Sequence, residues 1–219
     1  DVKPSIAKRL KRERRIKRLM GLCLGLALLP FAALLVLLLL KGLPALSFTM
    51  LFRAPRSGFY LGGGGGIANA IAGSLLLGGG GILMASLVGF PAAIALQRDV
   101  LPRVLIRAAR FVLDLLWGVP SIVTGAFVFL LTVRVGAGAS LLAGMVALAL
   151  VMLPILVRGM DQALGAVPHE LKESAFAMGA TRSETFRSVV LRQAFPGLVT
   201  ALLLALGRGL GDAASVLFT

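Results

Sequence analysis

Histidine, cysteine and acidic residues are scarce in this chain of 219 residues, which has one His, one Cys and nine Asp plus Glu. Cys23 lies inside an apolar run, so the sequence contains neither a disulfide framework nor a cysteine-based zinc site. His169 has no second histidine near it, which argues against a metal site built from imidazoles. Because the sequence also has no nucleophile–base arrangement and no pair of catalytic carboxylates, it gives little support to an enzyme.

Nucleotide-binding motifs are missing as well. The sequence has no G-x-x-x-x-G-K-S/T phosphate loop. The glycine runs Gly62–Gly66 and Gly78–Gly81 do not connect a strand to a helix, as the turn of a dinucleotide-binding fold does. We therefore expect this chain to bind no cofactor, and we expect any ATP hydrolysis to take place in a separate subunit.

Apolar residues are abundant instead, since 58% of the chain is hydrophobic, 15% is charged and the mean hydropathy is +0.95. A helix needs about 20 apolar residues to cross the hydrocarbon layer of a bilayer. Long uncharged runs predict an all-α, polytopic transmembrane bundle with five spans. The expected spans are Leu19–Leu40, Ile67–Gln97, Leu115–Val133 (with a start near Arg107), Val135–Val157 and Gln193–Thr219, the last interrupted by Arg208 and Asp212.

Basic residues are distributed unevenly among the segments that connect these spans. Of the 23 Lys and Arg, 18 lie before the first span or in the second-to-third and fourth-to-fifth connections. Cytoplasmic segments of membrane proteins are enriched in Lys and Arg, so the pattern predicts a cytoplasmic N-terminus. The alternate connections hold only four basic residues, Lys41, Arg53, Arg56 and Arg134, and Arg208 lies within a span.

The basic residues at the start of the chain define a separate N-terminal segment, 1–18, ahead of a transmembrane domain over 19–219. Leu19–Leu40 is longer than the apolar core of a secretory signal peptide, which has about 7–15 residues. Nucleic-acid binding is not expected, because the basic run lacks interleaved aromatic residues and adjoins a span. Contact with the anionic head groups of the lipid bilayer explains the charge.

The connection after the fourth expected span, about 166–188, begins with the pattern of a short amphipathic helix. Leu171, Ala175 and Met178 are spaced at i, i+4 and i+7, which places them on one helical face. Gly179 then permits a bend in the chain.

A second helix is expected to follow the bend. Thr181 and Glu184 have the spacing of a capping box. Phe186, Val189 and Val190 are expected to form the apolar face of this helix. A helix–glycine–helix element of this kind is either a docking surface for another protein or an ordinary amphipathic loop at the membrane surface.

The stretch Glu173-Ser174-Ala175-x3-Gly179 resembles the E-A-A-x3-G signature of the inner-membrane subunits of ABC importers. In that family the signature forms the coupling helix that inserts into a groove of the ATPase subunit. The resemblance implies that these four residues dock an ATPase. Ser174 replaces an alanine of the family pattern, and Arg192 replaces a proline, which is expected to alter how the second helix ends.

Four further motifs, in the same order along the chain, are similar to the permease subunits of phosphate-specific ABC importers. Asp212 stands where these permeases have Glu, and Ser215 stands where they have Pro. They also have a sixth span beyond this point, which we expect to be missing here. The motifs are Lys41–Ser47, Gly66–Ser74, Gly118–Val123 and Gly207–Thr219.

The resemblance also implies the partners and the location of a permease that works by alternating access. A PstB-like dimer of ATP-binding subunits is expected to use ATP and Mg. A PstC-like second permease subunit is expected to share the pore, and a PstS-like periplasmic binding protein to deliver phosphate. The expected location is the bacterial inner (plasma) membrane.

Arg208 and Asp212 stand one helical turn apart in the fifth expected span, where ionisable residues are costly and functional by default. One interpretation is an ion pair that holds two helices together. The other is a polar station on the path of an anion, because arginine offers forked donors suited to phosphate oxygens. Asp212 either orients Arg208 or accepts a hydrogen bond from a protonated phosphate oxygen, which sulfate does not have at neutral pH. In the family, the matching arginine and acid are implicated in transport.

Pro120 interrupts the backbone hydrogen bonds of the third expected span and is expected to free the carbonyl of Leu116. Ser121 and Thr124 are nearby polar partners. The expected outcome is either a simple kink or a gate beside the transport pathway.

Three other residues are expected to have a local structural role and no part in transport. Asp114 is expected to pair with Arg110, one turn earlier. Trp117 is expected to be an interfacial or packing aromatic residue, and His169 to be solvated.

Together these observations predict the permease subunit of an ABC importer, which forms the membrane pathway for inorganic phosphate. The first alternative is an importer of molybdate or sulfate, since the charged pore residues constrain the charge of the substrate better than its identity. The second is a non-transporting membrane scaffold that relays phosphate status to a signalling partner.

Overall fold

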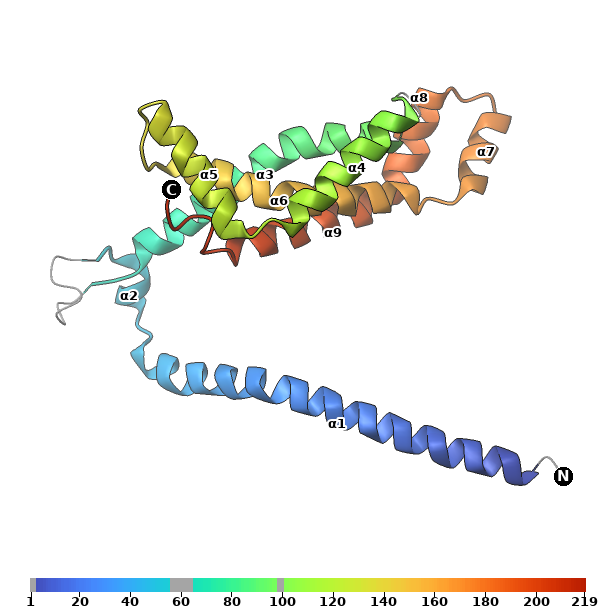
Figure 1. Ribbon diagram of the computed structural model, residues 1–219, viewed down its shortest axis with the longest axis horizontal. Helices are drawn as coiled ribbons and strands as arrows, with labels where there is room; N and C mark the ends of the chain where they lie inside the picture. Colours follow the sequence, from blue (N-terminus) through green and yellow to red (C-terminus); the bar gives the residue numbers. More distant parts are fainter. Residues whose placement is uncertain (1–2, 56–64, 98–100) are drawn as a thin grey trace. The chain divides into compact units, whose positions relative to one another are not determined.

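The computed structural model describes residues 3–55, 65–97 and 101–219, and within these ranges every regular element is a helix (Figure 1). The predicted all-α class is therefore confirmed. The chain divides into two compact units, Asp1–Asn69 and Ala70–Thr219. Arg56, Arg98 and Gly62–Gly64, to which the predictions above refer, lie outside the described residues.

The first unit consists mainly of the helix α1 (Lys3–Gly42), followed by the 3-10 turn η1 (Leu43–Ala45) and the short helix α2 (Phe48–Phe52). α1 has 40 residues. At about 1.5 Å per residue it is roughly twice as long as the ~30 Å hydrocarbon layer. The basic segment and the first expected span are therefore two parts of one helix.

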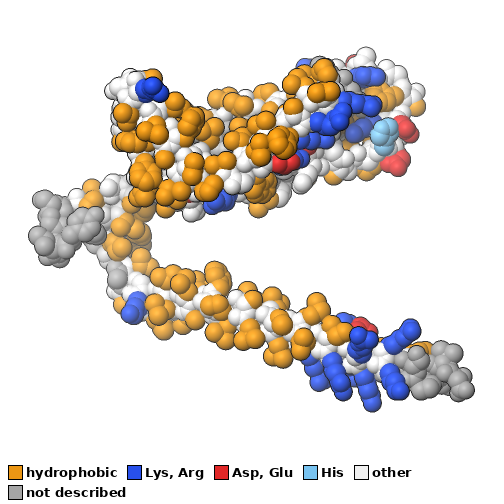
Figure 2. All heavy atoms as spheres, viewed as in Figure 1, with side chains coloured by type: hydrophobic (Ala, Val, Ile, Leu, Met, Phe, Trp, Pro, Cys, Tyr) orange, Lys and Arg blue, Asp and Glu red, His pale blue; other side chains and the backbone are white. Residues whose placement is uncertain are grey.

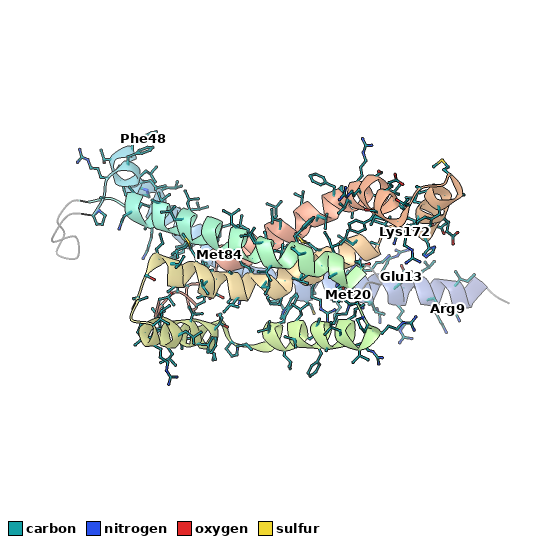
Figure 3. All side chains as sticks on the ribbon, turned by 90° about the horizontal axis from the view of Figure 1, so that it is seen from above. Arg9, Glu13, Met20, Phe48, Met84 and Lys172 are labelled. Carbon is teal, nitrogen blue, oxygen red and sulfur yellow. The ribbon has the colours of Figure 1, made fainter. Side chains whose placement is uncertain are left out.

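The change from charged to apolar side chains along α1 is visible in Figure 2. Figure 3 labels Arg9 and Glu13 in the charged part and Met20 in the apolar part. The large apolar side chains of α1 are exposed throughout. In a membrane they are available to lipid or to a partner subunit.

The second unit contains the remaining helices. α3 and α6 are long and apolar, and α8 continues through the π-helical turn η3 into α9 without a break. α4 and α5 are shorter and follow one another closely. The bounds are α3 (Ala68–Gln97), α4 (Arg103–Gly118), α5 (Ser121–Arg134), α6 (Leu141–Gly165), α7 (His169–Ala177), α8 (Arg182–Thr185), η3 (Phe186–Val190) and α9 (Leu191–Leu210).

α6 is the central helix of this unit and packs against α3, α4, α5 and α9. Met152, Leu156 and Leu164 of α6 are almost completely buried in an apolar core to which α3, α4 and α9 also contribute. α3 and α9, which are far apart in the sequence, thus both pack against α6.

Small residues allow α6 and α9 to approach closely. A Cβ atom built on Gly159 would lie 2.7 Å from the Cβ of Ala201, and one built on Gly197 would lie 2.7 Å from the Cβ of Ala163. Each helix therefore presents a small residue, three others and a second small residue, and the two patterns run in opposite directions. Such pairs of small residues drive helix packing in membranes, where apolar burial alone does not.

The run Gly78–Gly81 has a similar role in α3. Gly78 faces Leu210 of α9, whereas Gly80 and Gly81 face Met145 and Leu148 of α6, and an added Cβ would lie within 3.0 Å of these side chains at each of the three positions. This run is therefore a surface of close helix packing.

The third expected span is two helices rather than one. α4 and α5 are bent by 101° at Val119 and Pro120, which is more than a simple kink (Figure 1). The expectation of a free Leu116 carbonyl is wrong, because this oxygen accepts a hydrogen bond from the Val119 N–H at 3.3 Å. By length and composition, four described helices can cross a membrane, or five if the bent pair counts as one span, in agreement with the predicted number.

The bounds of the last two expected spans differ from the prediction. The fourth begins at Leu141 instead of Val135, because Gly136 and Gly138 adopt positive φ angles of 75° and 62° in a turn, and it continues to Gly165. The fifth ends at Leu210, and 211–219 is not helical. This final segment packs against α5 at Gly125, where an added Cβ would lie 2.2 Å from the carbonyl oxygen of Ser215.

Basic side chains of the second unit gather at the end that carries α7 and α8 (Figure 2). They come from the start of α4, the last turns of α6 and the helices after it, which belong to the two connections predicted to be rich in Lys and Arg. The two connections therefore lie at the same end of the unit.

Candidate functional site

Arg208 and Asp212 come together at the C-terminal end of α9. Nη2 of Arg208 lies 3.4 Å from Oδ2 of Asp212, and Oδ1 of Asp212 accepts a hydrogen bond from the Ser215 N–H at 3.2 Å. The Asp212 side chain is 2% exposed, whereas that of Arg208 is 52% exposed. The buried carboxylate thus holds the guanidinium on one side and the C-terminal turn on the other.

The position of Asp212 differs from the sequence prediction, because α9 ends before it. Gly211 is the C-cap residue, and the Asp212 N–H bonds to the carbonyl of Gly209 at 3.1 Å. The two charged residues therefore meet across a helix terminus and not on the face of a continuous span.

Arg208 lines a small cavity of about 80 Å³ that also touches α4, α5 and α6. The other lining residues include the hydroxyl-bearing Ser121 and Thr124 at the start of α5, and Trp117 at the end of α4. Ser121 and Arg208, which the sequence placed in different spans, are thus brought to one cavity by the break between α4 and α5. The remaining lining residues are Leu116, Val119, Val151, Pro154 and Ile155.

Asp212 faces a different and larger cavity of about 320 Å³ between α3, α6 and the C-terminal segment. Leu77, Leu148 and Leu217 are among the residues that line it. The guanidinium and the carboxylate thus border separate cavities. Arg208 lines the smaller, polar cavity, whereas Asp212 contacts Arg208 without lining that cavity.

The helix–glycine–helix element after α6 forms as predicted. Gly179 has a φ of +85° between α7 and α8, a conformation that L side chains rarely adopt. The capping box is also present, because the Thr181 hydroxyl accepts from the Glu184 N–H at 3.3 Å while Glu184 Oε2 accepts from the Thr181 N–H at 2.8 Å. The hydrogen bonds from the backbone and the hydroxyl of Thr181 lower the pKa of Glu184 below its ordinary value of 4.5.

Residues of the E-S-A-x3-G stretch are mostly exposed on α7. Ala175 is buried, but Glu173 is exposed and its carboxylate lies 3.2 Å from Nδ1 of the exposed His169. The Ser174 hydroxyl donates to the carbonyl of Glu170 at 2.7 Å, so the replacement of alanine by serine is accommodated within the helix.

Two expectations for this loop are wrong. Met178 does not continue the helical face of Leu171 and Ala175, because α7 ends at Ala177; its side chain is 84% exposed. Arg192 does not end the second helix, which continues from α8 through η3 into α9. Phe186 and Val190 are buried and Val189 is partly buried, as the predicted apolar face requires.

A network of charged and polar side chains joins the ends of α3, α4 and α6. Buried Asp161 accepts hydrogen bonds from Nη2 of Arg110 at 3.2 Å and, through its backbone carbonyl, from Nε2 of Gln97 at 2.9 Å. Asp114 pairs with Arg158, so the predicted Asp114–Arg110 pair is wrong.

The sequence analysis did not identify Asp161, because the fourth span was expected to end at Val157. A helical continuation past that residue puts Asp161 on the face that carries Val157 and Leu164 toward the core. The spacing of Val157, Asp161 and Leu164, at i, i+4 and i+7, was the sequence signal that could have identified Asp161.

Comparisons with known proteins agree with this architecture. The family described as Binding-protein-dependent transport system inner membrane component matches residues 85–219. The Phosphate transport system permease protein PstA of Yersinia pestis is 35% identical over 94% of this chain and 71% of its own length. The protein of the same name from Haemophilus influenzae is 36% identical over 83% of this chain and 64% of its own length.

A solved structure is also similar. The MetNI methionine ABC transporter in an inward-facing conformation aligns with a TM-score of 0.60 and 26% identity, over 66% of this chain and 70% of that chain. The helical bundle is therefore of the ABC-importer permease type, in a multi-pass membrane protein. On this evidence the chain belongs to the family of binding-protein-dependent transport system inner membrane components.

Proposed function

We propose that this chain is the permease subunit of an ABC importer and forms part of the membrane pathway for inorganic phosphate. The observation that carries the proposal is the half-exposed Arg208 guanidinium at a polar cavity between helices, held from behind by the buried Asp212. The names of the relatives in Yersinia and Haemophilus support phosphate as the substrate.

The chemistry of the pair suits a tetrahedral oxyanion. Arginine remains charged at every physiological pH and presents several N–H donors in a plane, which match phosphate oxygens. Asp212 orients the guanidinium and partly neutralises it, so that the anion is held without being trapped. The ion pair joins the end of α9 to the turn that follows it and does not hold two helices together, so of the two interpretations left open by the sequence we propose the polar station.

The α7–α8 element is proposed to couple ATP hydrolysis to transport. Its exposed residues Glu173 and Ser174 dock on an ATPase dimer, and Gly179 fixes the angle between the two helices. Closure of the ATPases moves α7 and, through the continuous α8–α9 helix, the end of α9 that carries Arg208. The second permease subunit and the phosphate-binding protein complete the importer.

The distribution of basic residues supports an orientation in the inner membrane with the N-terminus and α7 in the cytoplasm. Both basic connections lie at one end of the second unit, as this orientation requires (Figure 2). ATP and Mg are then used on the same side, in the partner ATPase, and this chain performs no chemical step.

ATP-driven uptake of labelled phosphate into vesicles that contain the whole assembled importer tests the proposal. Uptake that resists excess sulfate and molybdate, and that falls strongly in Arg208→Ala but not in the exposed control Arg134→Ala, is the expected result. Suppression by sulfate or molybdate would assign a different oxyanion. An assembled complex without any flux would overturn transport and favour a scaffold in phosphate sensing.

A further inference from the structure

The break between α4 and α5 places backbone that is not helical beside a polar cavity. In the hydrocarbon region of a membrane, such backbone is tolerated only where protein buries it or where it lines a cavity. Here Val119 at the break, Ser121 just after it and Arg208 from α9 all line the same space of about 80 Å³. The break is therefore part of the cavity wall.

The N-terminal end of α5 lies at this cavity wall, because its first residue, Ser121, lines the cavity. Its N-cap residue, Pro120, provides no side-chain hydrogen bond to the first turn. The carbonyl of Pro120 accepts from the N–H groups of Val123 at 2.9 Å and Thr124 at 3.4 Å. The N–H groups of Ser121 and Ile122 have no hydrogen-bond partner in the described part of the chain. These two donors, together with the positive end of the helix dipole, favour an anion.

The hydroxyls of Ser121 and Thr124 are a second and independent set of donors. A threonine inside a helix commonly donates its hydroxyl to a carbonyl three or four residues earlier. Thr132 of α5 and Thr200 of α9 do so, at 2.9 Å and 2.8 Å. Among residues 3–55, 65–97 and 101–219, neither Ser121 nor Thr124 has a hydrogen-bond partner for its hydroxyl, and both line the cavity.

We infer that Ser121, Thr124 and the first turn of α5 form, with Arg208, a subsite for one tetrahedral oxyanion. This inference rests on the proposed function and deepens it, because it names the other half of the site that Arg208 begins. Half-helix N-termini that point at anionic substrate groups occur at the binding sites of other membrane transporters built from broken helices.

The size and the walls of the cavity fit a small inorganic ion. Pockets for organic ligands commonly measure about 300–1,000 Å³, much more than the volume beside Arg208. Trp117, Pro154 and Ile155 supply apolar parts of its wall. Beside an apolar wall, a hydrogen bond to a charged oxygen contributes more than it does in bulk water.

Hydroxyl groups also distinguish phosphate from sulfate. A serine or threonine hydroxyl both donates and accepts, whereas guanidinium and backbone N–H groups only donate. At neutral pH phosphate retains a proton and sulfate does not. Ser121 and Thr124 therefore accept a hydrogen bond from the protonated oxygen of phosphate, a role that Asp212, which does not line this cavity, is not placed to perform.

Hydroxyl deletion in the whole importer tests the subsite. Thr124→Val replaces a hydroxyl by a methyl group of similar size, and Ser121→Ala removes a hydroxyl. The matched control Thr132→Val removes a hydroxyl from the same helix outside the cavity. Loss of a hydrogen bond to a charged ligand corresponds to about a tenfold effect. We expect the maximal uptake rate at saturating binding protein to fall about tenfold in each cavity variant, and the control to stay within about twofold of wild type.

A thiol-protection experiment gives a readout that is independent of rate. Thr124→Cys and the control Thr132→Cys are prepared in a Cys23→Ser background, since Cys23 is exposed. Labelling of this chain is then followed during turnover with ATP, binding protein and inorganic phosphate. We expect phosphate to protect position 124 and not position 132, and sulfate to protect neither.

The outcomes separate the two proposals. If the wild-type importer takes up no phosphate, the proposed function fails. If the wild type transports phosphate while the double variant Ser121→Ala/Thr124→Val transports at the normal rate and position 124 is not protected, the subsite is overturned and the function stands. Reduced uptake together with protection of position 124 supports the subsite.

Discussion

α1 and α6 are both long and apolar enough to cross a membrane, yet their surroundings differ completely. In the most apolar stretch of α1 none of the residues is buried, whereas half of those in the corresponding stretch of α6 are buried. Gly21 and Gly25 of α1 have no atom within 4 Å of an added Cβ, whereas Gly159 of α6 faces Ala201. Apolarity thus indicates that a helix can enter the membrane, but it does not indicate which helices pack against each other. Nor does the spacing of small residues alone, because Gly21 and Gly25 of α1 are spaced like Gly159 and Ala163 of α6.

The physical reason is that a lipid tail is as apolar as a leucine side chain. Inside a bilayer, helix packing depends on van der Waals fit and hydrogen bonds, because apolar burial gives little advantage. The leucine-rich α1 presents a surface suited to lipid or to a partner, while α6 presents glycine, alanine and methionine to its neighbours.

The largest contrast is expected from leucine truncation. Leu156 of α6 is 0% exposed, whereas Leu28 of α1 is 52% exposed. Leu156→Ala should lower the free energy of unfolding by about 2–5 kcal/mol through the lost contacts and the cavity left behind. Leu28→Ala should change it by less than about 0.5 kcal/mol. Denaturant titration in mixed micelles measures both values, and equal losses would contradict the comparison.

A smaller loss of stability is expected when a methyl group is added at Gly125, next to the backbone of Ser215. Gly125→Ala places a Cβ 2.2 Å from the carbonyl oxygen of Ser215, so the C-terminal segment must move. The expected cost is about 1–3 kcal/mol, as for overpacking of a well-packed core. Gly25→Ala in α1 is the control, since nothing lies nearby and alanine favours a helix. Melting midpoints of the solubilised protein should fall for the first variant alone, and an unchanged midpoint for Gly125→Ala would refute the packing of this segment.

Removal of a carboxylate should likewise lower the free energy of unfolding more in α6 than in α1. Asp161 is 6% exposed and its carboxylate accepts from Arg110 and Gln97, so Asp161→Ala removes the acceptor of Arg110 and leaves Gln97 only the backbone carbonyl, at a cost of about 1–3 kcal/mol. Glu13 of α1 pairs with Lys17 in an exposed i,i+4 pair, which contributes less than about 1 kcal/mol. Glu13→Ala is therefore the matched control. A loss of similar size in both variants, measured by the same titration, would show that the Asp161 network does not join α3 and α4 to α6.

The smallest effect concerns pH and the cap of α8. Hydrogen bonds lower the pKa of Glu184, so the folded state favours the ionised carboxylate. The stabilisation is present above the ordinary value of 4.5 and is lost as the pH falls through the lowered value. Hydrogen exchange at the first turn of α8 should therefore accelerate in acid in wild type but not in Glu184→Gln, after correction for intrinsic exchange. An identical pH profile in the two proteins would exclude a contribution of this cap.

Much of the α7–α8 element could be predicted from the sequence, because its signals are local. Gly179 supplies the turn, and Thr181 with Glu184 supplies the cap, within a few residues of one another. The same locality explains why Ser121 and Arg208 were recognised only as separate features. They are far apart in the chain, and the break between α4 and α5 brings them to one cavity.

The predicted spans show where local signals are insufficient. Hydropathy cannot distinguish one span from two half-helices, so the bend of 101° at Pro120 required the structure. The predicted helix through Thr219 failed because the glycines at the end of α9 and the buried side chain of Asp212 favour a turn that packs against Gly125.

The sequence by itself determined that this protein is an all-helical, multi-pass membrane protein with a helix–glycine–helix loop, because apolar run length and capping are properties of neighbouring residues. Only the tertiary structure decided which helix is central, which carboxylate pairs with which arginine and which donors surround the cavity beside Arg208. Those outcomes depend on close contacts between residues distant in the chain, which small side chains allow and which no local pattern specifies.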